Sequence, residues 1–205
     1  MRFVIAIGLG LISFSSAFAA SHADRSTCSS ATASDNATIN ACTNVIDTQD
    51  KAYDRAAAYY NRGLAYANKG EYDRAIANYD QAVRLDPKDA RTYNNRGAAF
   101  ASKGEYNRAI ADCDDAIRLN PQYAAAYNNR AWDYFKAGKA AQGLPDADKS
   151  LELRPNNAKA LSTRGHIFEA LGRREEAIAD FKRSLSKNPN MQTSKDALKR
   201  LGVKP

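Results

Sequence analysis

The chain has 205 residues, a formal net charge of +7, 26% charged residues and 44% hydrophobic residues. These values are ordinary for a soluble protein of one or two folded domains. Its cations alternate with carboxylates and never form a block of five or more Lys and Arg. The composition therefore favours a solvated basic surface and disfavours a nucleic-acid-binding tract.

The first residues are typical of a secretory leader. Arg2 precedes an apolar run of about a dozen residues, which ends near the small-x-small triplet Ala17-Phe18-Ala19. The run is too short for a comfortable membrane span. We expect a signal peptide over residues 1–19, cleaved after Ala19, and a mature protein in the periplasm or outside the cell. An uncleaved anchor is the alternative.

Two cysteines lie ahead of the main part of the chain. The Ser-rich segment 20–33 is expected to be flexible, and segment 34–55 to be a degenerate half-repeat with one helix from its Ser-Asp start signal. In an exported protein, Cys28 and Cys42 are expected to form a disulfide. A third cysteine, Cys113, falls on an apolar helix face and is expected to be a small core residue.

The next stretch repeats itself four times at a fixed spacing of 34 residues. Three residue types recur in phase: Pro87, Pro121, Pro155 and Pro189; Gly70, Gly104, Gly138 and Gly172; Arg62, Arg96, Arg130 and Arg164. The copies span residues 56–89, 90–123, 124–157 and 158–191. Self-similarity of this period is the signature of a stacked repeat array.

Each copy predicts two helices joined at the turn glycine. The first helix carries large residues in a 3.6-residue rhythm and one small residue where a neighbour needs to come close: Gly63, Gly97, Ala131 or Gly165. The second carries an apolar face, such as Ala75, Ile76, Tyr79 and Ala82 in the first copy. Because one helix pair cannot bury this face alone, the pairs are expected to stack.

The third copy and the C-terminal end depart from this pattern. Gly143, Pro145 and Ala147 interrupt the second helix of copy three, which is expected to start late, near Leu144 or Pro145, and to pack loosely. Residues 192–205 predict a capping helix, with Leu198 and Leu201 packing onto copy four.

In these features the chain resembles the tetratricopeptide repeat family. Copy one carries the family's pattern at Tyr59, Gly63, Tyr66, Gly70, Ala75, Tyr79, Ala82 and Pro87. Copies two and four match at most of the same positions, whereas copy three departs in its second helix. The resemblance implies an all-α, right-handed α-solenoid of helix-turn-helix repeats with a capping helix. It also implies that the first helices line a concave groove.

The resemblance further implies which residues face that groove. They are Tyr60, Asn61, Leu64 and Asn68 in copy one; Arg91, Asn94, Asn95 and Ser102 in copy two; Asn128, Asn129, Trp132, Phe135 and Lys136 in copy three; and Lys159, Ser162, Thr163, His166 and Glu169 in copy four. The function expected from this surface is that of an adaptor or scaffold that holds a peptide or a segment of a partner protein. Binding of an acidic polymer, such as nucleic acid or polysaccharide, is the alternative.

One repeat position is Asn61, Asn95, Asn129 and then Thr163. A side-chain amide both donates and accepts hydrogen bonds, so this row could hold an extended peptide backbone whatever its side chains. The row could also serve only helix packing and solvation. Trp132 and Tyr60 are candidate stacking anchors. The carboxylate clamp of chaperone-tail-binding members is not expected, because Tyr60, Leu64 and Ala125 occupy its positions.

The repeated arginines and the acidic residues favour structural uses. Arg62, Arg96, Arg130 and Arg164 are expected to lie off the groove and to pair with carboxylates of adjacent helices. The acidic cluster Asp112, Asp114 and Asp115 is expected to be a solvated helix face. The sequence contains no metal-ligand spacing, phosphate loop or nucleophile motif, so neither a cofactor nor an enzymatic activity is expected.

Overall fold

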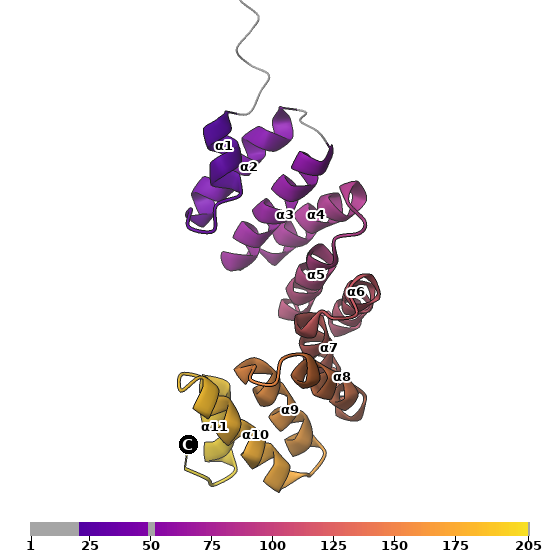
Figure 1. Ribbon diagram of the computed structural model, residues 1–205, viewed down its shortest axis with the longest axis vertical. Helices are drawn as coiled ribbons and strands as arrows, with labels where there is room; N and C mark the ends of the chain where they lie inside the picture. The colour runs from indigo at the N-terminus through magenta and orange to yellow at the C-terminus, as the bar shows by residue number, and fades with distance from the viewer. Residues whose placement is uncertain (1–20, 49–51, 205) are drawn as a thin grey trace, which may run out of the picture.

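The computed structural model describes residues 21–48 and 52–204, so the expected signal peptide lies outside the described residues. The described part forms eleven helices and no strand. They are α1 (His22–Cys28), α2 (Asp35–Asp47), α3 (Ala52–Asn68), α4 (Tyr72–Leu85), α5 (Ala90–Ser102), α6 (Tyr106–Leu119), α7 (Ala124–Lys136), α8 (Ala140–Leu153), α9 (Ala158–Ala170), α10 (Arg174–Lys187) and α11 (Gln192–Arg200). Consecutive helices follow an arc, with α6 and α8 outside α5 and α7 (Figure 1). The expected all-α solenoid is confirmed.

A glycine in the left-handed conformation ends the first helix of each repeat. Gly70, Gly104, Gly138 and Gly172 have φ values between 74° and 79°. The residue after each glycine donates its backbone N–H to a carbonyl five residues back, as Glu71 does to Tyr66 at 2.9 Å. This is the Schellman pattern, which satisfies the last carbonyls of a helix and turns the chain sharply. The tight turn places the two helices of each repeat side by side.

Small residues allow these paired helices to come close. A Cβ added at Gly63 would lie 2.7 Å from Cε1 of Tyr79, and one added at Gly165 would lie 2.7 Å from Cε1 of Phe181. The third repeat reverses the arrangement, because its close residue is Gly143 in α8. A Cβ there would lie 2.7 Å from the carbonyl oxygen of Ala131. The expectation of loose packing in this repeat was therefore wrong.

The second helix of the third repeat also begins earlier than expected. α8 starts at Ala140 and contains Pro145 in its interior. Proline cannot donate the hydrogen bond that the carbonyl of Ala141 would otherwise receive. Because Ala141 and Pro145 are both exposed, that carbonyl can be hydrated, and the helix continues through the proline.

Each repeated arginine joins two outer helices. Arg96 in α5 donates to both carboxylate oxygens of Asp112 in α6, at 2.9 and 2.6 Å, and to Asp80 in α4 at 2.7 Å. The same arrangement recurs as Arg130 with Asp146 and Asp114, and as Arg164 with Asp180 and Asp148. The expected pairing with neighbouring carboxylates is confirmed for these three arginines and was wrong for Arg62, which pairs with two neutral side chains. These contacts fix the stacking of consecutive repeats.

The first repeated arginine shows that α2 occupies the place of an outer helix. Arg62 donates to Asn78 Oδ1 in α4 and to Thr43 Oγ1 in α2, both at 2.8 Å. α2 begins after the N-cap Ser34, as the start signal predicted. Its Cys42 and Val45 are buried. The front of the array is therefore covered by a helix that contacts the first repeat as one repeat contacts the next.

The segment 20–33 was expected to be flexible, but α1 forms there. Ser21 caps this helix, accepting from the backbone N–H of Asp24 at 3.0 Å, while the Asp24 carboxylate accepts from Ser21. Asn44 in α2 donates to Asp24 at 3.1 Å. As expected, Cys28 and Cys42 lie at disulfide distance, with sulfurs 2.10 Å apart. The front of the array is thus a short helix pair and not a single helix.

The C-terminal helix covers the last repeat as predicted. Leu198 is fully buried beside Phe168 and Phe181, and Leu201 packs at the edge of the same cluster. Arg200 donates to both carboxylate oxygens of Glu169 in α9, at 2.8 and 2.6 Å. Within the described ranges, none of the helices combines the length and apolar character needed to cross a membrane.

Candidate functional site

A network of side-chain hydrogen bonds connects the first helices of the first three repeats, α3, α5 and α7, which we call inner helices. Asn95 in α5 donates to the hydroxyl of Tyr60 in α3 at 3.0 Å. Asn94 donates to the side-chain oxygen of Asn95 at 3.2 Å, and Asn129 in α7 donates to that of Asn94 at 2.9 Å. Residues singled out from the sequence in three different repeats are thus brought into one network. Burial raises the pKa of Tyr60, so its hydroxyl stays neutral and keeps its proton.

This network uses only part of the hydrogen-bonding capacity of Asn95 and Asn129. A side-chain amide has two N–H donors and an oxygen with two lone pairs. Asn95 and Asn129 are half-buried and each spends one N–H on a neighbouring helix, whereas Asn94 is buried. The row of asparagines therefore serves helix packing and still offers polar atoms at the surface. Thr163, which continues the row in α9, is buried at 5% exposure.

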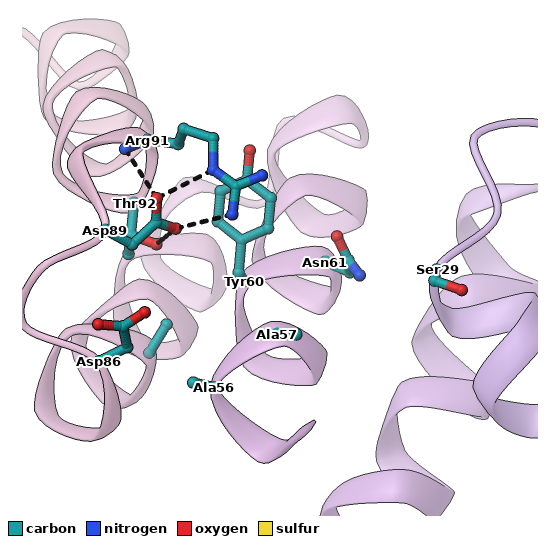
Figure 2. A pocket seen from close by; sticks show the side chains of 10 residues that line it. Ser29, Ala56, Ala57, Tyr60, Asn61, Asp86, Asp89, Arg91 and Thr92 are labelled. Atoms are coloured by element: carbon teal, nitrogen blue, oxygen red, sulfur yellow. Dashed lines mark hydrogen bonds and ion pairs between the residues drawn. The ribbon is translucent and has the colours of Figure 1, made fainter. Parts of the chain in front are cut away.

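One hollow lies at the N-terminal end of the inner face, between α3 and α5. It has a volume of about 330 Å³ and is lined by Tyr60, Asn61, Asp89, Arg91 and Thr92, with Ser29 reaching it from the end of α1. Figure 2 shows Asp89 facing both Arg91 and Thr92, and Arg91 beside the ring of Tyr60. The guanidinium carbon of Arg91 is 5.3 Å from the centre of that ring. The hollow combines two carboxylates, Asp86 and Asp89, with a cation, an aromatic ring and an amide.

An aromatic cluster occupies the other end of the inner face. Trp132 and Phe135 in α7 lie 5.2 Å apart between ring centres, and His166 in α9 lies 5.6 and 5.7 Å from them. Phe181 completes the cluster 4.9 Å from His166. Burial lowers the pKa of His166, so its imidazole is neutral at pH 7. This histidine, with its side chain 12% exposed, therefore packs among the rings as a neutral group and does not act as a cation there.

Several other expected groove residues take part in packing. Asn68 donates to Asp35 in α2 at 3.0 Å, and Ser162 is buried within 3.1 Å of Thr193. Asn128 is half-buried, and its side-chain oxygen is buried with no hydrogen-bond partner within residues 21–48 and 52–204. Glu169 is held by Arg200, so its carboxylate is not free for a ligand.

A second hollow, of about 350 Å³, lies between α5 and α7, where Trp132 and Lys136 meet Ser102 and Asn129. The Lys136 ammonium is 5.8 Å from the centre of the Trp132 ring. Asp133 also lines this hollow, although it is not among the residues expected from the sequence to face the groove. Aligning the four copies at their 34-residue spacing would have pointed to Asp133, because it is the only acid at its repeat position. The equivalent residues of the other copies are Ala65, Ala99 and Ile167, all buried and apolar.

The chain is similar to known repeat proteins in sequence. The family model described as tetratricopeptide repeat matches residues 90–123 and 158–191. The model described as TPR repeat matches residues 66–104. No curated protein sequence matches the chain.

Solved structures share the arrangement of the helices. The crystal structure of MamA is 26% identical with a TM-score of 0.66, covering 77% of this chain and 91% of that one. The first TPR of Spaghetti (RPAP3), bound to the HSP90 peptide SRMEEVD, is 31% identical with a TM-score of 0.57 and covers 58% and 95%. The second TPR domain of human RPAP3, in complex with the HSP70 peptide SGPTIEEVD, is 28% identical with a TM-score of 0.55 and covers 57% and 98%.

Proposed function

Because the chain belongs to the tetratricopeptide repeat family, we propose that it is a protein-interaction module that holds a peptide or a segment of a partner protein along α3, α5, α7 and α9. Two structures similar to it are complexes with peptides. The family is generally one of non-enzymatic interaction folds, and an adaptor or scaffold role follows from that.

The observation that carries this proposal is the row of side-chain amides of Asn95 and Asn129, which have hydrogen-bonding groups left unpaired and lie near the hollows between α3 and α5 and between α5 and α7. Asn95 and Asn129 can each still donate and accept, which are the two things a peptide bond requires. The hollows on either side present Tyr60 and Trp132, and aromatic side chains supply much of the binding energy at protein interfaces. A bound segment would therefore be held by its backbone in the middle and by side chains at the two hollows.

We propose that the protein works outside the cytoplasm, in the periplasm or as a secreted protein. The leader-like N-terminus and the Cys28–Cys42 pair support this location, because disulfides persist mainly in oxidising compartments.

The alternative, binding of an acidic polymer, is less favoured by the arginine contacts. Arg96, Arg130 and Arg164 each pair with two carboxylates and lie at most 21% exposed in their side chains. An arginine already paired with two carboxylates is not available to neutralise a phosphate, so it displaces no counterion from a bound polyanion.

The proposal is tested by selecting binders from a phage-displayed library of random peptides on the mature chain. The selected peptides are then measured against the Asn95→Ala/Asn129→Ala double variant. We expect at least a tenfold loss of affinity with the helical circular-dichroism spectrum retained. The matched control is Asn107→Ala/Asn156→Ala, which removes two exposed amides outside the inner face and should leave binding unchanged. An equal dissociation constant for both double variants would contradict the proposal.

A further inference from the structure

The hollow between α5 and α7 contains a buried acid that the protein does not pair. Asp133 is 1% exposed, and its Oδ2 atom has no hydrogen-bond partner among the residues that the structure describes. Burying a carboxylate without a partner is strongly unfavourable, so such groups are rare unless something else satisfies them. The neighbouring repeats show that the fold does not need an acid here, because Ala99 and Ile167 fill the same place.

The walls of this hollow suit one long side chain. Its lining combines small residues of α5, Ala98 and Ala101, with the larger Tyr106 of α6 and Trp132 of α7. Ala98 stands at the repeat position that Trp132 occupies one copy later, so the space opposite the indole is left open. A volume of about 350 Å³ is at the lower end of the range for ligand sites.

The hollow is lined by one acid, Asp133, and one cation, Lys136, and it is the unpartnered acid that favours a cation as the occupant. The protein's own cation there, Lys136, is exposed and lies over the Trp132 ring, 5.8 Å from its centre, so this ring face already attracts an ammonium group. An ammonium or guanidinium group that reached Asp133 would form a charge-assisted hydrogen bond, which is stronger than a neutral one. The pKa of Asp133 is raised to about 7 by burial, and a cation beside it would lower that pKa again.

We propose that this hollow is a subsite for a lysine or arginine side chain of the bound partner segment, with its charged end on Asp133 and its stem between Tyr106 and Trp132. This inference rests on the proposed function, and it specifies that the bound partner segment presents a lysine or arginine side chain to this hollow. The partner segment accordingly carries a basic residue where it passes between α5 and α7.

The chain contains a single tryptophan, Trp132, so its fluorescence reports on this hollow directly. The mature chain is titrated with Nα-acetyl-L-argininamide, Nα-acetyl-L-lysinamide and the neutral isostere Nα-acetyl-L-citrullinamide. A saturable change is expected with the two cationic probes, with binding at least tenfold weaker for the citrulline probe. Asp133→Asn should lose at least tenfold in affinity for the cations. The matched control Asp115→Asn lies on the outer helix α6, where Asp115 pairs with Arg118, and should behave as the parent.

Two results would overturn the subsite: no saturable response to either cation, or equal affinities of the parent and Asp133→Asn. The peptides selected from the library separate this inference from the proposed function. If they bind the inner face but carry no enriched Lys or Arg, and Asp133→Asn binds them as the parent does, the subsite is wrong and the proposed function stands. If no peptide binds while the cationic probes still require Asp133, the subsite stands and the proposed function is wrong.

Discussion

Arg96 donates two parallel hydrogen bonds to Asp112, from Nε to Oδ2 at 2.9 Å and from Nη2 to Oδ1 at 2.6 Å. Its remaining terminal nitrogen reaches Asp80 in the preceding outer helix at 2.7 Å. The side chain of Asp112 is 7% exposed, so this ion pair is largely shielded from water. One side chain thus fixes the two helices of its own repeat and the repeat before it.

Replacing Arg96 with Met is expected to destabilise the array by about 3 kcal/mol, since it leaves the Asp112 carboxylate buried without a partner. Urea unfolding followed by circular dichroism measures the loss. Arg118→Met is the control, because Arg118 and Asp115 form an exposed pair whose side chains are 66% and 43% accessible. Such pairs contribute about 0.5 kcal/mol. Equal losses for the two variants would show that the buried contact has no special role.

Asp133 should make the stability of the protein depend on pH. Its pKa is raised from 3.8 to about 7 in the folded chain, so between these values the folded state binds more protons than the unfolded state. Stability therefore falls as pH rises through this window. Asp133→Asn is expected to be more stable than the parent by roughly 2–4 kcal/mol at pH 8, and by much less at pH 4.

Urea midpoints of both proteins at the two pH values check this. The titratable neighbours of Asp133 include Tyr106 and Cys113 in α6 and Lys136 in α7. Burial raises the pKa of Cys113 well above its usual range, so this thiol stays neutral up to pH 8. A stability difference between parent and variant that does not change with pH would contradict a neutral Asp133 in the fold.

The Cys28–Cys42 bond should stabilise the front of the array. The two cysteines are 14 residues apart, and closing a loop of this length contributes about 3 kcal/mol in the chain-entropy model. Reduction, or the double change Cys28→Ser/Cys42→Ser, is expected to lower stability by about that amount and to speed hydrogen exchange in α1 first. Identical exchange rates in the oxidised and reduced proteins would count against this role.

The third repeat offers a test of helix spacing. Gly143→Ala is expected to cost about 1–3 kcal/mol, since the new Cβ would lie 2.7 Å from the carbonyl oxygen of Ala131. Adding Ala131→Gly restores the order of small residues seen in the other repeats, with Gly in the first helix. The double variant should recover part of the loss in thermal denaturation. Additive destabilisation by the two changes would contradict the inferred exchange.

The features that the sequence predicted are those that repeat. Pro87 and its equivalents mark the period, Gly70 and its equivalents mark the turns, and Arg96 and its equivalents face acids at fixed spacing, so each interpretation had several independent copies to support it. Single features were harder. The start of α8 depended on whether the carbonyl of Ala141 could reach water, which only the packed structure decides.

Candidate residues for the inner face could be proposed from the repeat pattern, whereas their contacts with one another could not. The bond between Asn129 and Asn94 depends on how α7 is rotated against α5, and no residue pattern gives that angle. Asp133 could have been predicted, because it is an acid at a repeat position where the other copies have the apolar residues Ala65, Ala99 and Ile167. Comparing the copies position by position would have selected it. The helix α1 was missed because Ser-rich composition outweighed the capping pattern of Ser21 and Asp24.

The most direct test of a binding inner face is to map where a selected peptide sits. Amide and side-chain shifts of the labelled protein lacking residues 1–19 are followed by nuclear magnetic resonance as the peptide is added. Binding along the groove predicts the largest shifts at the side-chain amides of Asn61, Asn95 and Asn129 and at the indole of Trp132, with α4, α6, α8 and α10 little changed. Shifts concentrated on those four outer helices, with the asparagine amides unmoved, would contradict it.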